Sequence, residues 1–286
     1  MKTRTAMFAG SWYPDNANAC EKQISVFLEE GRKKRPSSDR HWIGGIVPHA
    51  GWYFSGSIAC NVIYCLTFGE QPDVIALFGM HLHPNSNRYI TKTGAFETPF
   101  GGLAIAEDLS RQLTRKFQFS IETTERFTPD NTIELQLPFI KYFFPDVRII
   151  PVGVPPHQSS LEVGQSLATL ASESGTRLKV IGSTDLTHYG ANYDFTPKGS
   201  GASALKWVTE ENDRRVIDRI VNMDAKGVLE EGLTHQNACC AGAAATAIYT
   251  AEKLGADTAE SLAYTTSHAK SPGDSFVGYV GVVFGA

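Results

Sequence analysis

Short apolar runs alternate with longer amphipathic segments along the whole of this 286-residue chain. Runs of about four to eight β-branched residues, bounded by Gly or Pro, are typical of strands that are covered on both faces. The pattern predicts buried strands at 42–48, 73–79, 147–152 and 178–183 and a C-terminal strand at 276–284. The amphipathic segments predict helices at 21–34, 55–68, 107–116, 132–144, 159–173, 203–223 and 239–254.

This alternation defines the expected fold class, because strands separated by helices form sheets with helices packed on both faces. We predict an α/β protein with a central mixed, largely parallel sheet, in a three-layer α/β/α sandwich. The chain contains no internal repeat, no low-complexity segment and no long linker. A single domain over residues 1–286 is therefore expected.

Composition and charge exclude several classes of partner. The chain is 42% hydrophobic and 20% charged, with a formal net charge of -4 and no basic cluster, so neither nucleic acid nor an anionic membrane is an expected partner. No apolar run approaches the roughly 20 residues that cross a bilayer, and the N-terminus does not resemble a signal peptide. An odd count of five cysteines predicts reduced thiols in the cytoplasm.

Polar residues follow three of the predicted strands at the point where each strand ends. His49 follows the first, His81 and His83 follow the second, and Asp185 and His188 follow the fourth. Functional groups in open α/β sheets gather beyond the carboxyl ends of strands. One loop histidine would be unremarkable, but this recurrence indicates a shared site.

Two or three histidines with one anionic ligand can bind a divalent transition metal. The anionic candidates are Asp185, Glu134 and the thiolates of Cys239 and Cys240. Cys239 opens the predicted small-residue helix, where the helix dipole favours a thiolate. We expect Cys240 to be a buried structural thiol, because neighbouring residues on a helix point in different directions.

Other catalytic motifs are absent from the sequence, which has no P-loop, no dinucleotide-binding glycine motif, no nucleophile elbow and no H-E-x-x-H. The aromatic pairs Trp12-Tyr13 and Trp52-Tyr53 either line a pocket or fill the core.

Seven short motifs follow one another along the chain: AGSWYP at 9–14, PHAGW at 48–52, GAFETP at 94–99, ELQLPF at 134–139, STDLTHYG at 183–190, the Cys239 segment, and YTTS at 264–267. In this order they resemble the Memo-like family, also called AmmeMemoRadiSam system protein B. The resemblance spans essentially the whole chain. It implies a fold similar to that of LigB-type class III extradiol dioxygenases, which are non-heme iron enzymes.

The resemblance also implies a metal site of two histidines and one cysteine, placed here at His49, His81 and Cys239. The spacing before the second histidine is one residue shorter than in the family. Counting back from residues 94–99 favours His81, and His83 is the alternative. Asp185 and His188 match residues that line the same pocket, with an acid–base or hydrogen-bonding role.

The function expected from this resemblance is a metal-dependent oxidoreductase of unknown substrate. Fe(II) is the first choice of metal, with Cu or Zn as alternatives, and His188 would move a proton while Asp185 orients it. Asn131 stands where many relatives have a histidine, and an amide is neither an acid nor a base near neutral pH. This departure also supports a non-catalytic scaffold that binds a metal, a small molecule or a peptide. A third alternative is an accessory protein whose partners are a radical S-adenosylmethionine enzyme and an AMMECR-type protein.

Overall fold

The computed structural model describes residues 2–36 and 40–286, and its centre is a block of four parallel strands. Their order in the sheet differs from their order in the chain, so the connections cross over. Side by side they run β2 (Trp42–Val47), β9 (Leu178–Ser183), β3 (Val74–Gly79) and β8 (Arg148–Gly153).

Antiparallel pairs flank this block and make the sheet mixed. On the β2 side, β12 (Phe276–Gly285) pairs antiparallel with β2, and β11 (Thr258–Thr266) and β10 (His188–Tyr189) pair antiparallel with β12. On the β8 side, β4 (Tyr89–Thr91) pairs antiparallel with β8 and parallel with β7 (Ser120–Glu122). A separate small sheet is formed by β1 (Thr3–Arg4), β5 (Ala95–Phe96) and β6 (Leu103–Ala104).

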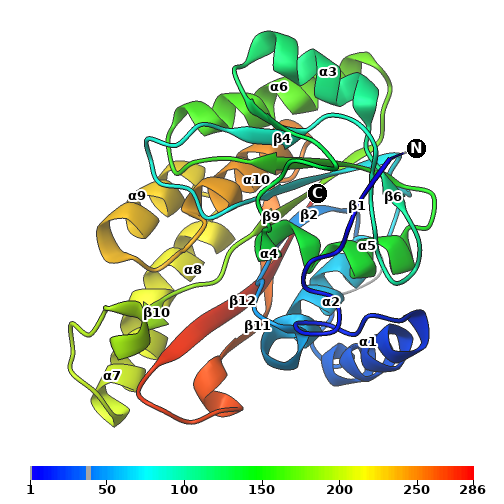
Figure 1. The fold of residues 1–286 in the computed structure, drawn as a ribbon. Helices are drawn as coiled ribbons and strands as arrows, with labels where there is room; N and C mark the ends of the chain where they lie inside the picture. Colours follow the sequence, from blue (N-terminus) through cyan, green and yellow to red (C-terminus); the bar gives the residue numbers. More distant parts are fainter. Residues whose placement is uncertain (1, 37–39) are drawn as a thin grey trace.

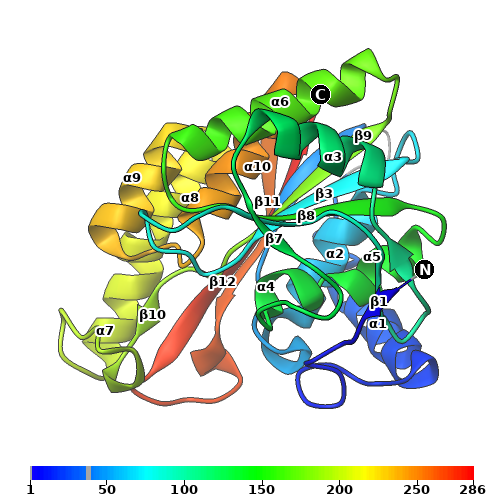
Figure 2. The same cartoon turned by 45° about the horizontal axis from the view of Figure 1, so that its top comes forward.

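Helices cover both faces of the large sheet, as Figures 1 and 2 show. One layer contains α1 (Ala17–Gly31), α2 (Ser57–Cys65), α4 (Asn131–Glu134) and α5 (Leu137–Phe143). The opposite layer contains α3 (Glu107–Lys116), α6 (Ser159–Glu173), α8 (Asp213–Val221), α9 (Ala225–His235) and α10 (Ala241–Lys253). The predicted three-layer α/β/α sandwich is therefore confirmed.

The core follows directly from the apolar runs. Every residue of β2, β3 and β9 is buried, as expected for strands that are covered on both faces. Small residues bring α10 unusually close to the sheet at Gly182. A Cβ added there would lie 2.8 Å from the Ala247 Cβ and 2.9 Å from the Ala243 carbonyl oxygen. The close packing of α10 on β9 thus leaves room only for small side chains such as alanine.

Two predicted helices differ from regular α-helices in the structure: one is divided in two, and the other contains a π-helical turn. The segment 132–144 forms α4 and α5 as separate helices, because Pro138 has no N–H to donate to the Glu134 carbonyl. The segment 203–223 forms α7 (Ala202–Trp207), a π-helical turn (Val208–Asn212) and α8. The predicted helix at 239–254 begins two residues later, at Ala241, so Cys239 lies before the helix.

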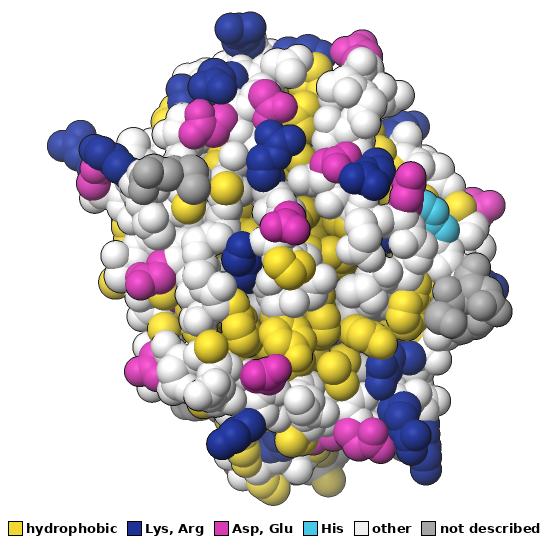
Figure 3. Space-filling model, turned by 90° about the vertical axis from the view of Figure 1, so that its right-hand side faces the viewer, with side chains coloured by type: hydrophobic (Ala, Val, Ile, Leu, Met, Phe, Trp, Pro, Cys, Tyr) yellow, Lys and Arg dark blue, Asp and Glu magenta, His cyan; other side chains and the backbone are white. Residues whose placement is uncertain are grey.

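Several elements were not anticipated, namely α9, β11 and the short strands. Within residues 2–36 and 40–286, every helix is too short or too polar to cross a bilayer. Figure 3 shows positive and negative side chains interspersed around an apolar patch on one side of the molecule, with no continuous basic surface on that face.

Candidate metal centre

Three neighbouring parallel strands end at the same edge of the sheet, and the segments that follow them carry residues of the candidate site. β2 leads into His49, β9 into Asp185 and β3 into His81. Because β2, β9 and β3 lie side by side, residues separated by more than a hundred positions meet there. The prediction of a shared site beyond these strand ends matches this geometry.

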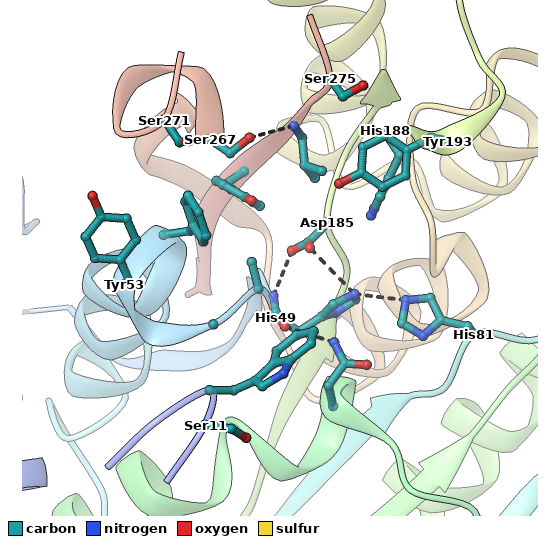
Figure 4. Close-up of a pocket in the computed structure, with 17 residues that line it drawn as sticks. Ser11, His49, Tyr53, His81, Asp185, His188, Tyr193, Ser267, Ser271 and Ser275 are labelled. Carbon is teal, nitrogen blue, oxygen red and sulfur yellow. Dashed lines mark hydrogen bonds and ion pairs between the residues drawn. The ribbon is translucent and has the colours of Figure 1, made fainter. Parts of the chain in front are cut away.

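The turn after β3 has an unusual conformation at Met80. Its φ is 71°, in the left-handed region that costs a side-chain-bearing residue roughly 1 kcal/mol or more. Packing compensates for this cost, since Met80 is 7% exposed and its amide donates to Thr132 Oγ1 at 2.7 Å. The next residue, His81, then faces His49 (Figure 4).

Four donor atoms converge at this point. His49 Nε2 lies 3.2 Å from His81 Nε2 and 3.3 Å from Cys239 Sγ. Cys240 Sγ lies 3.8 Å from Cys239 Sγ, and all four donors lie within 4.8 Å of one another. Nitrogen and sulfur ligands at about 2.0–2.3 Å from one tetrahedral ion lie about 3.3–3.8 Å apart. The three separations of 3.2, 3.3 and 3.8 Å therefore suit ligands of a single transition-metal ion.

Neighbouring groups hold the donors in orientations suited to a metal. Ser183 Oγ lies 3.0 Å from His49 Nδ1, which leaves Nε2 for coordination. The Asn131 side-chain amide donates to the His49 carbonyl at 3.0 Å. The Asp185 backbone amide donates to Cys239 Sγ at 3.3 Å, which stabilises negative charge on the sulfur.

Electrostatics couple the donors to one another. Burial opposes protonation of His49, but negative charge on Asp185 and Cys239 outweighs burial and raises the His49 pKa to about 9. Burial also opposes ionisation of Cys239, but hydrogen bonds from Cys240 and His49 and the positive charge of His49 lower the Cys239 pKa well below its usual value. Burial raises the pKa of Asp185 despite the opposing charge of His49.

Asp185 and Cys239 therefore compete for the same imidazolium. Cys239 has the shorter contact, 3.3 Å against 3.8 Å from the Asp185 carboxylate to His49 Nε2. A thiolate–imidazolium pair is the arrangement that the distances favour.

A cavity of about 590 Å³ opens beside these donors (Figure 4). Its wall includes both histidines of the donor group together with Asp185, His188 and Asn131. The remaining wall is aromatic or hydroxylated: Ser11, Trp12, Tyr53, Phe54, Tyr193, Ser267, Ser271, Ser275 and Tyr279, with Ala50, Gly51 and Val277.

The aromatic pairs at 12–13 and 52–53 split between the two roles that the sequence left open. Trp12 and Tyr53 line the cavity. Tyr13 and Trp52 are 4% and 2% exposed and pack with Phe139 and Phe27 in the core. Each pair therefore contributes one residue to the pocket and one to its support.

The structure also separates the remaining candidates. His83 is exposed and Glu134 is buried elsewhere; neither belongs to the donor group found among the described residues. Glu134 Oε1 instead accepts hydrogen bonds from the N-terminal segment.

Cys240 lies closer to the donor group than the sequence indicated. It is buried, as expected, but its sulfur joins the cluster because both cysteines precede α10 rather than lying on it. The hydroxyls of Tyr193, Tyr279 and Ser267 were also missed as pocket residues, and only the motif at 264–267 pointed to this wall.

The fold and the site together define an α/β sandwich with a His/Cys donor cluster at the edge of its parallel strands. The model of the family described as Memo-like protein matches residues 4–283, so the chain belongs to this family. A MEMO1 family protein of Pyrococcus furiosus is 32% identical, over 98% of this chain and 98% of its own length. A MEMO1 family protein of Methanosarcina barkeri is 31% identical, over 98% and 99%.

A solved structure shares the fold at much lower sequence similarity. The crystal structure of an uncharacterized protein of Escherichia coli K12 aligns with a TM-score of 0.54 and 12% identity, covering 85% of this chain and 99% of that chain. At this identity the likeness concerns the fold alone.

Proposed function

We propose that this protein is a metal-dependent oxidoreductase that acts on a small uncharged molecule. One observation carries the proposal: two donors of the cluster, His49 and His81, also form the wall of the 590 Å³ cavity. A molecule in the cavity would therefore lie directly against the metal centre.

His49, His81 and Cys239 would hold the ion, and Fe(II) or copper there would supply one-electron redox chemistry. A thiolate with two imidazoles also accepts Zn, which would support binding without redox chemistry.

His188 is the residue that we propose moves a proton. Its Nδ1 lies 3.2 Å from the Leu186 carbonyl oxygen, which can only accept, so Nδ1 carries the hydrogen. Nε2 is then left as the basic nitrogen. Asp185 is buried, and its carboxylate accepts from the His49 amide at 2.7 Å, which suits a role in orienting His49. Asn131 contributes no proton transfer.

The cavity wall supports an uncharged ligand. Away from the donor cluster, the described lining residues include no Lys or Arg to balance an anionic group, whereas Trp12, Tyr53 and Phe54 offer flat apolar surfaces. Hydroxyls of Ser11, Ser267, Tyr193 and Tyr279 can pair with carbonyl or hydroxyl groups.

All five cysteines are thiols, which supports a cytoplasmic location.

The test is metal content after anaerobic purification and loading with Fe(II) or Cu(I). We expect near-stoichiometric metal in the wild type and in Cys60→Ser, a buried thiol outside the cluster, and loss of metal in His49→Ala. Circular dichroism controls for folding. Oxygen uptake by the loaded wild type with a panel of uncharged phenols and carbonyl compounds, reduced in His188→Gln, would support turnover.

A metal- or peptide-binding scaffold is the second candidate, favoured by Asn131, which lines the cavity where many relatives have a histidine and which cannot transfer a proton near neutral pH. Stoichiometric metal without any oxygen uptake would favour this candidate. Absence of metal from the folded wild type would refute the metal centre.

A further inference from the structure

The second of the two adjacent cysteines has the geometry of a ligand rather than of a packing residue. Cys240 is 3% exposed, and its sulfur lies 3.8 Å from Cys239 Sγ. Its sulfur also lies within 4.8 Å of both histidine donor nitrogens. The 3.8 Å sulfur–sulfur separation equals the edge expected for two thiolates at about 2.3 Å from one tetrahedral ion.

Backbone contacts explain how two consecutive side chains reach one point. The Cys239 amide donates to the Asp185 carbonyl at 3.1 Å, and the Cys240 amide donates to Thr184 Oγ1 at 3.1 Å. Cys240 has φ -125° and ψ 52°, which is neither helical nor extended. The segment is thus fixed on the loop after β9, and neither helical nor strand geometry separates the two sulfurs.

We infer that Cys240 is a fourth ligand, so that the centre is a four-donor site with two thiolates and two imidazoles. On metal binding the Cys240 S–H proton passes to solvent and a sulfur–metal bond forms. This inference rests on the proposed metal centre and deepens it, because a second thiolate shifts selectivity towards soft metals. A tetrahedral ion with four protein ligands has no open position, so a molecule in the cavity would reach the metal only in a five-coordinate state. The alternative is that Cys240 only donates a hydrogen bond to the Cys239 thiolate.

Anaerobic titration with Co(II) distinguishes these arrangements. Thiolate-to-cobalt charge-transfer absorption in the near ultraviolet grows with the number of thiolates, and the visible bands report four-coordination. At saturation we expect Cys240→Ser and Cys239→Ser each to lose about half of the near-ultraviolet absorption. The reason is that each variant would keep only one of the two thiolate ligands. Cys60→Ser should match the wild type.

Affinity tests whether Cys240 belongs to the centre at all, as a ligand or as a hydrogen-bond donor to one. Competition with a chelator should show at least tenfold weaker Co(II) binding in Cys240→Ser, since even outer-shell substitutions cost about 10–100-fold. X-ray absorption of the cobalt-loaded wild type counts sulfur neighbours without any variant, and two are expected. This measurement decides the matter if Cys240→Ser fails to fold.

The outcomes separate the two proposals. One sulfur neighbour in the wild type, or a Cys240→Ser spectrum equal to that of the wild type, overturns the role of Cys240 but leaves the metal centre intact. Failure of the folded wild type to bind Co(II), Fe(II) or Cu(I) overturns both.

Discussion

Glu134 was an anionic candidate for the metal site, and the structure gives it a different and measurable role. The carboxylate is 3% exposed. Its Oε1 accepts from the Met7 amide at 2.8 Å, the Phe8 amide at 2.7 Å and the Tyr13 hydroxyl at 3.1 Å. One carboxylate therefore anchors the N-terminal segment that brings Ser11 and Trp12 to the cavity.

We predict that Glu134→Ala lowers the free energy of unfolding by about 3–5 kcal/mol. Each hydrogen bond to a charged group contributes about 1.5–3 kcal/mol, so the sum for three bonds is an upper bound that exceeds the predicted loss. Water recovers part of this loss, because the Met7 end of the segment is near the surface, with Met7 50% exposed. Glu134→Gln keeps one acceptor oxygen and should lose about half as much.

Urea denaturation measures both variants, and a double-mutant cycle with Tyr13→Phe isolates one bond. The expected coupling energy is about 1–2 kcal/mol, because Tyr13 is 4% exposed and its hydroxyl has no easy access to water. Metal stoichiometry of folded Glu134→Gln should equal that of the wild type, since this carboxylate is outside the donor group.

Three results would refute this reasoning. The first is a Glu134→Ala stability within about 0.5 kcal/mol of the wild type. The second is a coupling energy with Tyr13→Phe indistinguishable from zero. The third is loss of metal from folded Glu134→Gln, which would restore this residue as a ligand.

Two further predictions concern the layers around the site. Burial raises the pKa of Asp213 to about 6, although hydrogen bonds from Thr187 and Tyr264 oppose the shift. The folded state thus holds this proton more tightly than the unfolded state, so the stabilisation that Asp213 contributes is fully present below about pH 4 and is lost, by roughly 3 kcal/mol, as the pH rises through about 6. The difference in unfolding free energy between the wild type and Asp213→Asn, measured at a series of pH values, should fall by this amount; a difference that does not change with pH would contradict it. Gly182→Ala should cost about 1–3 kcal/mol by overpacking β9 against α10, and an unchanged melting temperature would show that the interface is looser than the 2.8 Å approach to Ala247 indicates.

The sequence predicted the part of this molecule that regular patterning encodes. Continuous apolar runs identified the four central strands, and the residues after their ends predicted the candidate site, because parallel strands place their carboxyl ends at one edge. His49 and Asp185 needed no further information, since each follows a strand almost immediately. The short strands β4 to β7 have two or three residues each, too few for any periodicity.

The arrangement of Cys239 and Cys240 could not be predicted from the same pattern. The run of small residues after them reads as one helix from Cys239 onward, and on a helix the two sulfurs would diverge. In the structure both residues precede α10, fixed by contacts to Thr184 and Asp185 that are more than fifty positions away in the chain. Only tertiary contacts decide where this helix begins, and its start decides how many sulfurs reach the cluster.

The choice between His81 and His83 depended on a single backbone conformation. The interval after Gly79 is one residue shorter than the family pattern, which left the histidine position open. Met80 adopts φ 71° and is held there by its amide bond to Thr132 and by burial. With Met80 in this conformation, His81 lies 3.2 Å from His49, whereas His83 lies outside the donor group. A methionine gives no sequence signal for a left-handed conformation, because glycine and asparagine are the residues that usually adopt it. The position of His81 therefore depends on the strained residue Met80, whose conformation can be recognised only from the residues that pack against it.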